Sequence, residues 1–135
     1  MAAPVNPGRW LVAALIAAST PVIADQVVCH LSYGGATQVV TARPVASPYT
    51  VAPVAIGSFF LFRIVYRDQP ADLAGIKLYT YAAHDSGPTL IHQASYPLPA
   101  AGGGDYGFTG LNAVYEPLRD GELHYWCERQ AGSEK

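Results

Sequence analysis

The strongest structural signal in the chain is the stretch GSFFLFRIVYR, residues 57–67. Successive side chains of a β-strand point to opposite faces, so every second residue of this stretch would share a face. One face is wholly apolar or aromatic and consists of Phe60, Phe62, Ile64 and Tyr66. The other face turns charged at Arg63 and Arg67. We therefore expect a central strand that is buried over its first half and emerges at Arg63.

The rest of the chain repeats this signal in shorter form. Runs rich in Val, Ile, Thr, Tyr and Phe alternate with turn residues. The expected strands are residues 26–33, 37–43, 57–67, 75–83, 89–96, 107–115 and 122–128. Helix signals are weak because Pro or Gly interrupts nearly every longer segment. The prolines between Pro44 and Pro53 remove backbone donors, so we expect an extended edge or a crossover there.

These strands predict an all-β fold, namely a small antiparallel β-sandwich of about seven strands. Their number and spacing resemble those of the immunoglobulin-like sandwiches that are common among exported proteins. The resemblance implies a fold and carries no function. The cysteines depart from the antibody pattern, because they lie on the first and last expected strands, and Trp126 lies beside Cys127 and not in the middle of the chain.

The first 24 residues have the layout of a secretory signal peptide. Arg9 precedes an apolar run that begins at Trp10, and small residues end the segment at Ala24. This run is shorter than the ~20 residues that span a bilayer core. We therefore expect cleavage between Ala24 and Asp25, a single domain over residues 25–135, and no membrane span after cleavage.

The chain has 2 cysteines, Cys29 and Cys127. An even pair in an exported chain predicts a disulfide, whereas two buried free thiols are the alternative. The bond would join the first expected strand to the last and close a loop over almost the whole domain. The chain-entropy model assigns such a loop about 4.7 kcal/mol of stabilisation as an upper figure.

Two of the 4 histidines lie close to the cysteines. If the cysteines face each other on antiparallel strands, His30 lies opposite Trp126 and diagonal to His124 on the reverse side of the pair. Two imidazoles at this range suit copper or zinc. The alternative is that both histidines lie on an outer sheet face and bond water or Glu128. Apart from this copper or zinc site, we expect no cofactor.

Tyrosine dominates the aromatic residues, with 9 Tyr against 4 Phe and 2 Trp. Tyr79 and Tyr81 share one face of the expected strand 75–83, and Lys77 on the same face marks it as outward. Tyrosine combines a large rigid ring with a polar tip, which suits protein partners and glycans. The alternative is that these tyrosines are ordinary strand residues with solvated hydroxyls.

No catalytic signature is evident. The run HDSGP, residues 84–88, contains the residue types of a hydrolytic triad, but three consecutive residues cannot bond in the required order. We expect a turn there, and another at residues 117–121, which Glu116 and Glu122 flank. The formal net charge of −2 becomes −3 without Arg9, which argues against a nucleic-acid partner.

The sequence thus predicts a non-enzymatic exported module that binds another exported or membrane protein. The expected contact residues are Tyr79, Tyr81 and Lys77. The alternative is a periplasmic copper or zinc protein whose ligands are His30 and His124, with His92 or a carboxylate as a further ligand. Both functions place the protein in the periplasm or outside the cell. An enzyme whose site is assembled from distant strands stays open as a third alternative.

Overall fold

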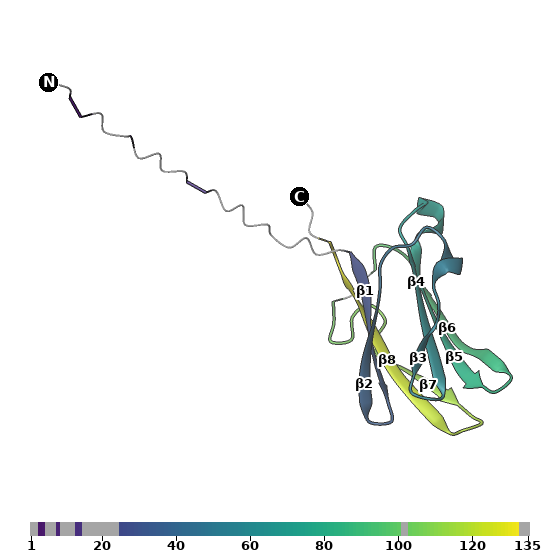
Figure 1. The fold of residues 1–135 in the computed structure, drawn as a ribbon. Coiled ribbons are helices and arrows are strands. Elements are labelled where there is room, and N and C mark those ends of the chain that lie inside the picture. The colour runs from purple at the N-terminus through teal and green to yellow at the C-terminus, as the bar shows by residue number, and fades with distance from the viewer. Residues whose placement is uncertain (1–2, 5–7, 9–12, 15–24, 101–102, 133–135) are drawn as a thin grey trace.

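The computed structural model describes residues 25–100 and 103–132, together with the isolated positions 3, 4, 8, 13 and 14. The predicted signal peptide falls almost entirely outside these residues and stays a prediction. The described domain is all-β, with its strands in two antiparallel sheets (Figure 1). Its helices are two short 3-10 turns, η1 (Pro48–Thr50) and η2 (Ala71–Leu73), and within the described part no helix is long and apolar enough to cross a membrane.

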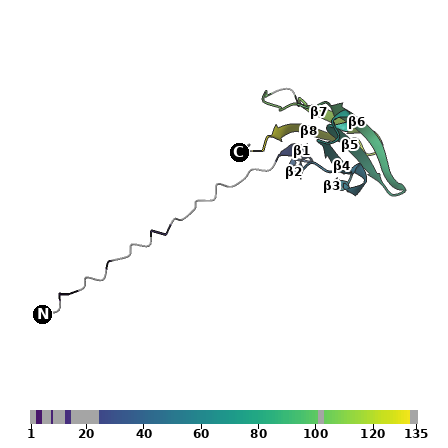
Figure 2. The same ribbon diagram turned by 90° about the horizontal axis from the view of Figure 1, so that it is seen from above.

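The two sheets contain 4 strands each and face one another as two layers (Figures 1 and 2). The first sheet has the order β2-β1-β8-β7 and consists of β1 (Gln26–Tyr33), β2 (Ala36–Ala42), β7 (Asn112–Glu116) and β8 (Gly121–Gln130). The second sheet has the order β3-β4-β5-β6 and consists of β3 (Val54–Ile56), β4 (Phe60–Arg67), β5 (Gly75–His84) and β6 (Gly87–Tyr96). The expected antiparallel sandwich is therefore confirmed.

The connectivity is a meander. Strands β3 to β6 follow one another within the second sheet, while β1 pairs with β8 in the first. Immunoglobulin domains share the two-layer antiparallel architecture but connect their strands as Greek keys. The stretch between Pro44 and Pro53 forms no strand and crosses from β2 in the first sheet to β3 in the second, as one of the two expected alternatives.

The core lies between the sheets and follows the predicted alternation. On β4 the buried side chains are Phe60, Phe62, Ile64 and Tyr66. The first sheet contributes buried residues such as Leu31, Leu123 and Tyr125 from its own inner face. Each fully buried large apolar side chain stabilises the fold by roughly 1.5–3 kcal/mol relative to its exposed state. Arg63 and Arg67 of β4 point the other way, toward the outer face of the second sheet.

The predicted disulfide between Cys29 and Cys127 is present. The two residues are direct partners in the β1–β8 register, with Cα atoms 4.0 Å apart, and both are fully buried. Because side chains alternate along both strands, His30 and its partner Trp126 point away from the core. The expected register between His30 and Trp126 is thereby confirmed.

The prediction that residues 57–67 form one strand is wrong at its beginning. Gly57 adopts a φ of 60°, and the chain turns at residues 57–59, so that Ile56 of β3 pairs with Phe60 of β4. A positive φ is readily available to glycine and rare for other residues. Residues 54–67 therefore form a hairpin, whose short first strand, β3, lies at the sheet edge.

The prediction of a strand over residues 107–115 is also wrong in its first half. Gly107 and Gly110 have φ values of 60° and 70°, and the Gly110 N–H donates to the carbonyl of Tyr106. These turns prevent a continuous ladder, so β7 begins only at Asn112. The other predicted strands match observed ones to within two residues at each end.

Candidate functional site

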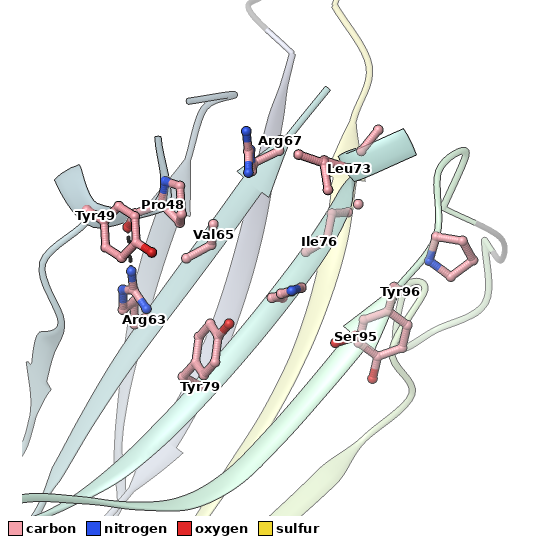
Figure 3. A pocket seen from close by; sticks show the side chains of 14 residues that line it. Pro48, Tyr49, Arg63, Val65, Arg67, Leu73, Ile76, Tyr79, Ser95 and Tyr96 are labelled. Atoms are coloured by element: carbon pink, nitrogen blue, oxygen red, sulfur yellow. Dashed lines mark hydrogen bonds between the residues drawn. The ribbon is translucent and has the colours of Figure 1, made fainter. Parts of the chain in front are cut away.

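A groove of about 510 Å³ lies on the outer face of the second sheet (Figure 3). We call it the β4–β5 groove, and its lining includes Tyr49, Arg63, Val65, Arg67, Leu73, Lys77, Tyr79, Ser95 and Tyr96. Figure 3 shows Arg63 and Tyr49 on one side and Ser95 and Tyr96 on the other. Val65 lies beneath the longer side chains and is only 2% exposed.

The strand register arranges three cationic side chains in this groove. Arg63 of β4 pairs with Tyr79 of β5, and Arg67 pairs with Gly75. Lys77 is the partner of Val65 and therefore lies between the two arginines along the strand direction. Because all of these positions alternate onto the outer face, the cations share one side of the sheet.

Arg63 holds the wall of the groove in place. Its Nε donates to the carbonyl oxygen of Val51 at 2.9 Å, and one terminal nitrogen donates to the carbonyl of Pro48. The guanidinium carbon lies 5.1 Å from the centre of the Tyr79 ring, within cation–π range. The Pro-rich crossover is thereby tied to β4, and η1 presents Tyr49 with 93% of its surface exposed.

The other two cations, Arg67 and Lys77, form fewer hydrogen bonds within the protein than Arg63. Arg67 donates to the carbonyl of Ala46 at 3.1 Å, which ties the start of the crossover to the end of β4. Lys77 is exposed and forms neither a salt bridge nor a side-chain hydrogen bond with any residue in the described ranges. Its ammonium is therefore available to a ligand.

The three predicted contact residues do lie together on the outer face of β5. Tyr79 and Lys77 line the β4–β5 groove, whereas Tyr81 does not. The Tyr81 ring stacks on that of Tyr79, with centroids 6.4 Å apart, and so supports it from outside the groove. Tyr49 and Arg63 were missed as groove residues, because their convergence depends on how the Pro-rich crossover folds back onto β4.

The predicted metal ligands lie on the outer face of the first sheet. The His30 ring stacks on Trp126 with centroids 4.0 Å apart, and His30 Nε2 is 3.9 Å from a Glu128 oxygen. His124 is hydrogen-bonded to Glu122 at 2.9 Å. Among residues 25–100 and 103–132, no group of three or more His, Cys, Asp or Glu side chains is arranged to hold a metal ion.

His92 lies on the other side of the first sheet from these two histidines. Its Nε2 is hydrogen-bonded at 2.8 Å to the hydroxyl of Tyr125, which is buried in the core. Burial lowers the pKa of His92 and so favours its neutral form. His92 therefore does not join His30 and His124 as the further ligand, and the copper or zinc function stays a prediction that depends on that pair and a carboxylate.

A second polar cluster joins the two sheets at the far end of β5. His84 Nε2 is 3.3 Å from a carboxylate oxygen of Glu116, which is 1% exposed and also accepts the backbone N–H groups of Leu118 and Arg119. Burial raises the pKa of Glu116, but these hydrogen bonds outweigh it and bring the pKa below its ordinary value. Glu116 thus stabilises the turn before β8, and residues 85–86 form the expected turn between β5 and β6.

Tyr96 contributes to the lining of the β4–β5 groove, but it pairs with the buried Ile76, so its ring points to the inner side of the sheet and packs edge-on against Phe108 with centroids 5.2 Å apart. Burial raises the pKa of Tyr96 above its ordinary value. On the outer face, the groove therefore combines three cations with the rings of Tyr49 and Tyr79. Comparison with protein-family models, with curated proteins and with solved structures finds no match to this chain.

Proposed function

We propose that this protein is an exported, non-enzymatic binding module that holds a partner protein in the β4–β5 groove. The observation that carries the proposal is the convergence of Tyr49, Tyr79 and Lys77 with two arginines in one hollow of the outer sheet face. Tyrosine and arginine are enriched where proteins bind one another, and they supply most of the residues that dominate binding energy.

The backbone of the groove wall around η1 is held in place by hydrogen bonds within the protein itself. The hydrogen bonds of Arg63 fix the backbone around η1, and the Ser47 side chain accepts the N–H of Tyr49 at 3.3 Å. A wall that is already ordered loses little conformational entropy when a partner docks. Tyr49 therefore offers a large exposed ring from a fixed backbone.

The disulfide supports the exported location in this proposal. Such bonds persist in oxidising compartments and are rare in the cytosol. Together with the predicted signal peptide, the bond between Cys29 and Cys127 favours the periplasm or the cell exterior as the place where the partner is met.

The test is co-purification after cross-linking in the native host. Tyr49→Ala and Tyr79→Ala should each lose the partner that the wild-type protein captures, with nearly unchanged melting temperatures. Tyr115→Ala is the matched control, because Tyr115 is a 54% exposed tyrosine on β7 of the other sheet. Equal capture by all four proteins would reject the groove as the binding site.

A further inference from the structure

We propose that the ligand of the β4–β5 groove is an extended acidic peptide segment with carboxylates at alternate residues, lying along β4 and β5. This inference rests on the proposed function and names the chemistry of the partner. Its two supports are the distribution of charge over the chain and the spacing of the groove's cations.

The charge of the groove is opposite to that of the chain. The chain carries 10 Asp and Glu against 8 Lys and Arg, yet three of these cations line the groove. Among the described residues, no Asp or Glu lines it. The carboxylates nearest along the chain are Asp68 and Asp72, which are exposed in the β4–β5 connection. The groove is therefore complementary to an anionic ligand.

The spacing of the cations matches an extended peptide. Arg63 and Arg67 lie four positions apart on β4, and Lys77 is paired with Val65, halfway between them. At ~3.3 Å per residue, the cations follow one another at steps of about 6.6 Å along the strand direction. Alternate side chains of an extended peptide have the same spacing.

The cations have the donors that such a ligand needs. The two hydrogen bonds of Arg63 to the crossover use two of its N–H groups, and a guanidinium has five. Arg67 has one side-chain hydrogen bond to a described residue, and Lys77 has none. Carboxylates bonded to guanidinium groups form the stronger, charge-assisted class of hydrogen bond. Each of the three positions can therefore receive one carboxylate of the segment.

The experiment measures fluorescence anisotropy of a labelled peptide, Val-Glu-Val-Glu-Val-Glu-Val, with the purified disulfide-bonded domain. We expect saturable binding that weakens as salt is raised, because the cations are partly exposed and are screened. A peptide with three consecutive Glu residues has the same charge but the wrong period and should bind more weakly. A peptide with Gln in place of Glu should not bind measurably.

Protein variants locate the binding. Arg67→Gln and Lys77→Gln should each weaken the alternating peptide about two- to fivefold, as expected for a partly exposed ion pair. Arg43→Gln is the matched control, because Arg43 is an exposed cation outside the groove and should leave the affinity unchanged. Circular dichroism and melting temperature verify that every variant folds.

Several outcomes overturn the inference: equal affinity for the two acidic peptides, no effect of the groove variants, or groove-dependent binding of dextran sulfate that is tighter than that of the peptide. If the peptide does not bind while Tyr79→Ala still loses the native partner, the acidic ligand is wrong and the proposed function stands. If the peptide binds in the groove while partner capture is independent of Tyr79, the proposed function is wrong.

Discussion

Removal of the disulfide should cost this domain a large part of its stability. The perturbation is the double variant Cys29→Ala/Cys127→Ala, which avoids leaving a single reactive thiol. The bond closes a loop of 98 residues, and the chain-entropy model gives about 4.7 kcal/mol for a loop of this size. In the folded protein β1 is also held by backbone pairing with both β2 and β8, so most of the loss arises from greater freedom of the unfolded chain. We expect a loss of about 3–5 kcal/mol, against a total of 5–15 kcal/mol for typical domains.

The assay is urea unfolding followed by tryptophan fluorescence, since Trp126 lies next to Cys127 on β8. The variant should have a lower unfolding midpoint, and the wild-type protein should approach it after reduction. Mass spectrometry of freshly isolated protein, without reductant, verifies that the wild type is oxidised at the start. A loss below about 1 kcal/mol, or two thiols that react with an alkylating reagent in denaturant, would refute the reasoning from loop closure and compartment.

Three further variants test the turns that flank β7. Gly107→Ala should lower the free energy of unfolding by about 2–4 kcal/mol in urea titrations, because a Cβ there would lie 2.1 Å from the Cys127 carbonyl oxygen and φ is 60°. Gly110→Ala is the control: φ at Gly110 is a similar 70°, but the space around it is open, so this variant should lose only about 1 kcal/mol. Glu116→Gln should lower stability at neutral pH but not in strong acid. The folded pKa of Glu116 lies below its ordinary value of 4.5, so its contribution is present above that value and disappears as pH falls through the folded pKa. Melting curves of both proteins from pH 7 to pH 2 should therefore converge in acid, and a constant difference would contradict this linkage.

The sandwich and its central strand were predictable because they depend on short-range rules. The alternation of Phe60, Phe62, Ile64 and Tyr66 follows from the two-residue period of a strand, and all four are buried. The register of β1 with β8 follows from one covalent constraint, the predicted disulfide, which also places His30 opposite Trp126.

The turns were harder to locate because glycine is compatible with both strand and turn. Gly57 and Gly107 each begin a stretch rich in strand-forming residues, and the sequence pattern does not reveal that their φ angles are positive. At Gly107 the deciding contact is with Cys127, 20 residues later in the chain, whose carbonyl leaves no room for a side chain. Such contacts become evident only once the strands are placed.

The same limit applies to the candidate site. The sequence predicted that β4 emerges from the core at Arg63, and this is wrong: Ile64, Val65 and Tyr66 after it are all buried, and Arg63 is itself half-buried on the outer face. Its hydrogen-bond partners are carbonyl groups of Val51 and Pro48, which no side-chain pattern identifies. The predicted face with Tyr79 and Lys77 therefore forms only one side of the candidate site. The other side consists of Tyr49 and the backbone of the Pro-rich crossover, which Arg63 holds in place.

The two outer sheet faces differ in whether carboxylates lie beside their basic side chains. On the first sheet, His124 bonds Glu122, and His30 stacks on Trp126 with its Nε2 3.9 Å from a Glu128 oxygen, so each histidine lies beside a carboxylate. On the second sheet, Lys77 has no such partner among the described residues, and no described carboxylate lines its groove. Unpaired charge of one sign beside exposed aromatic rings is more consistent with a surface that is completed by a ligand. Because Arg63 also holds the groove wall, its replacement would change the geometry and the charge of the groove together. Replacement of Lys77 would change only the charge, so it measures the electrostatic contribution to binding.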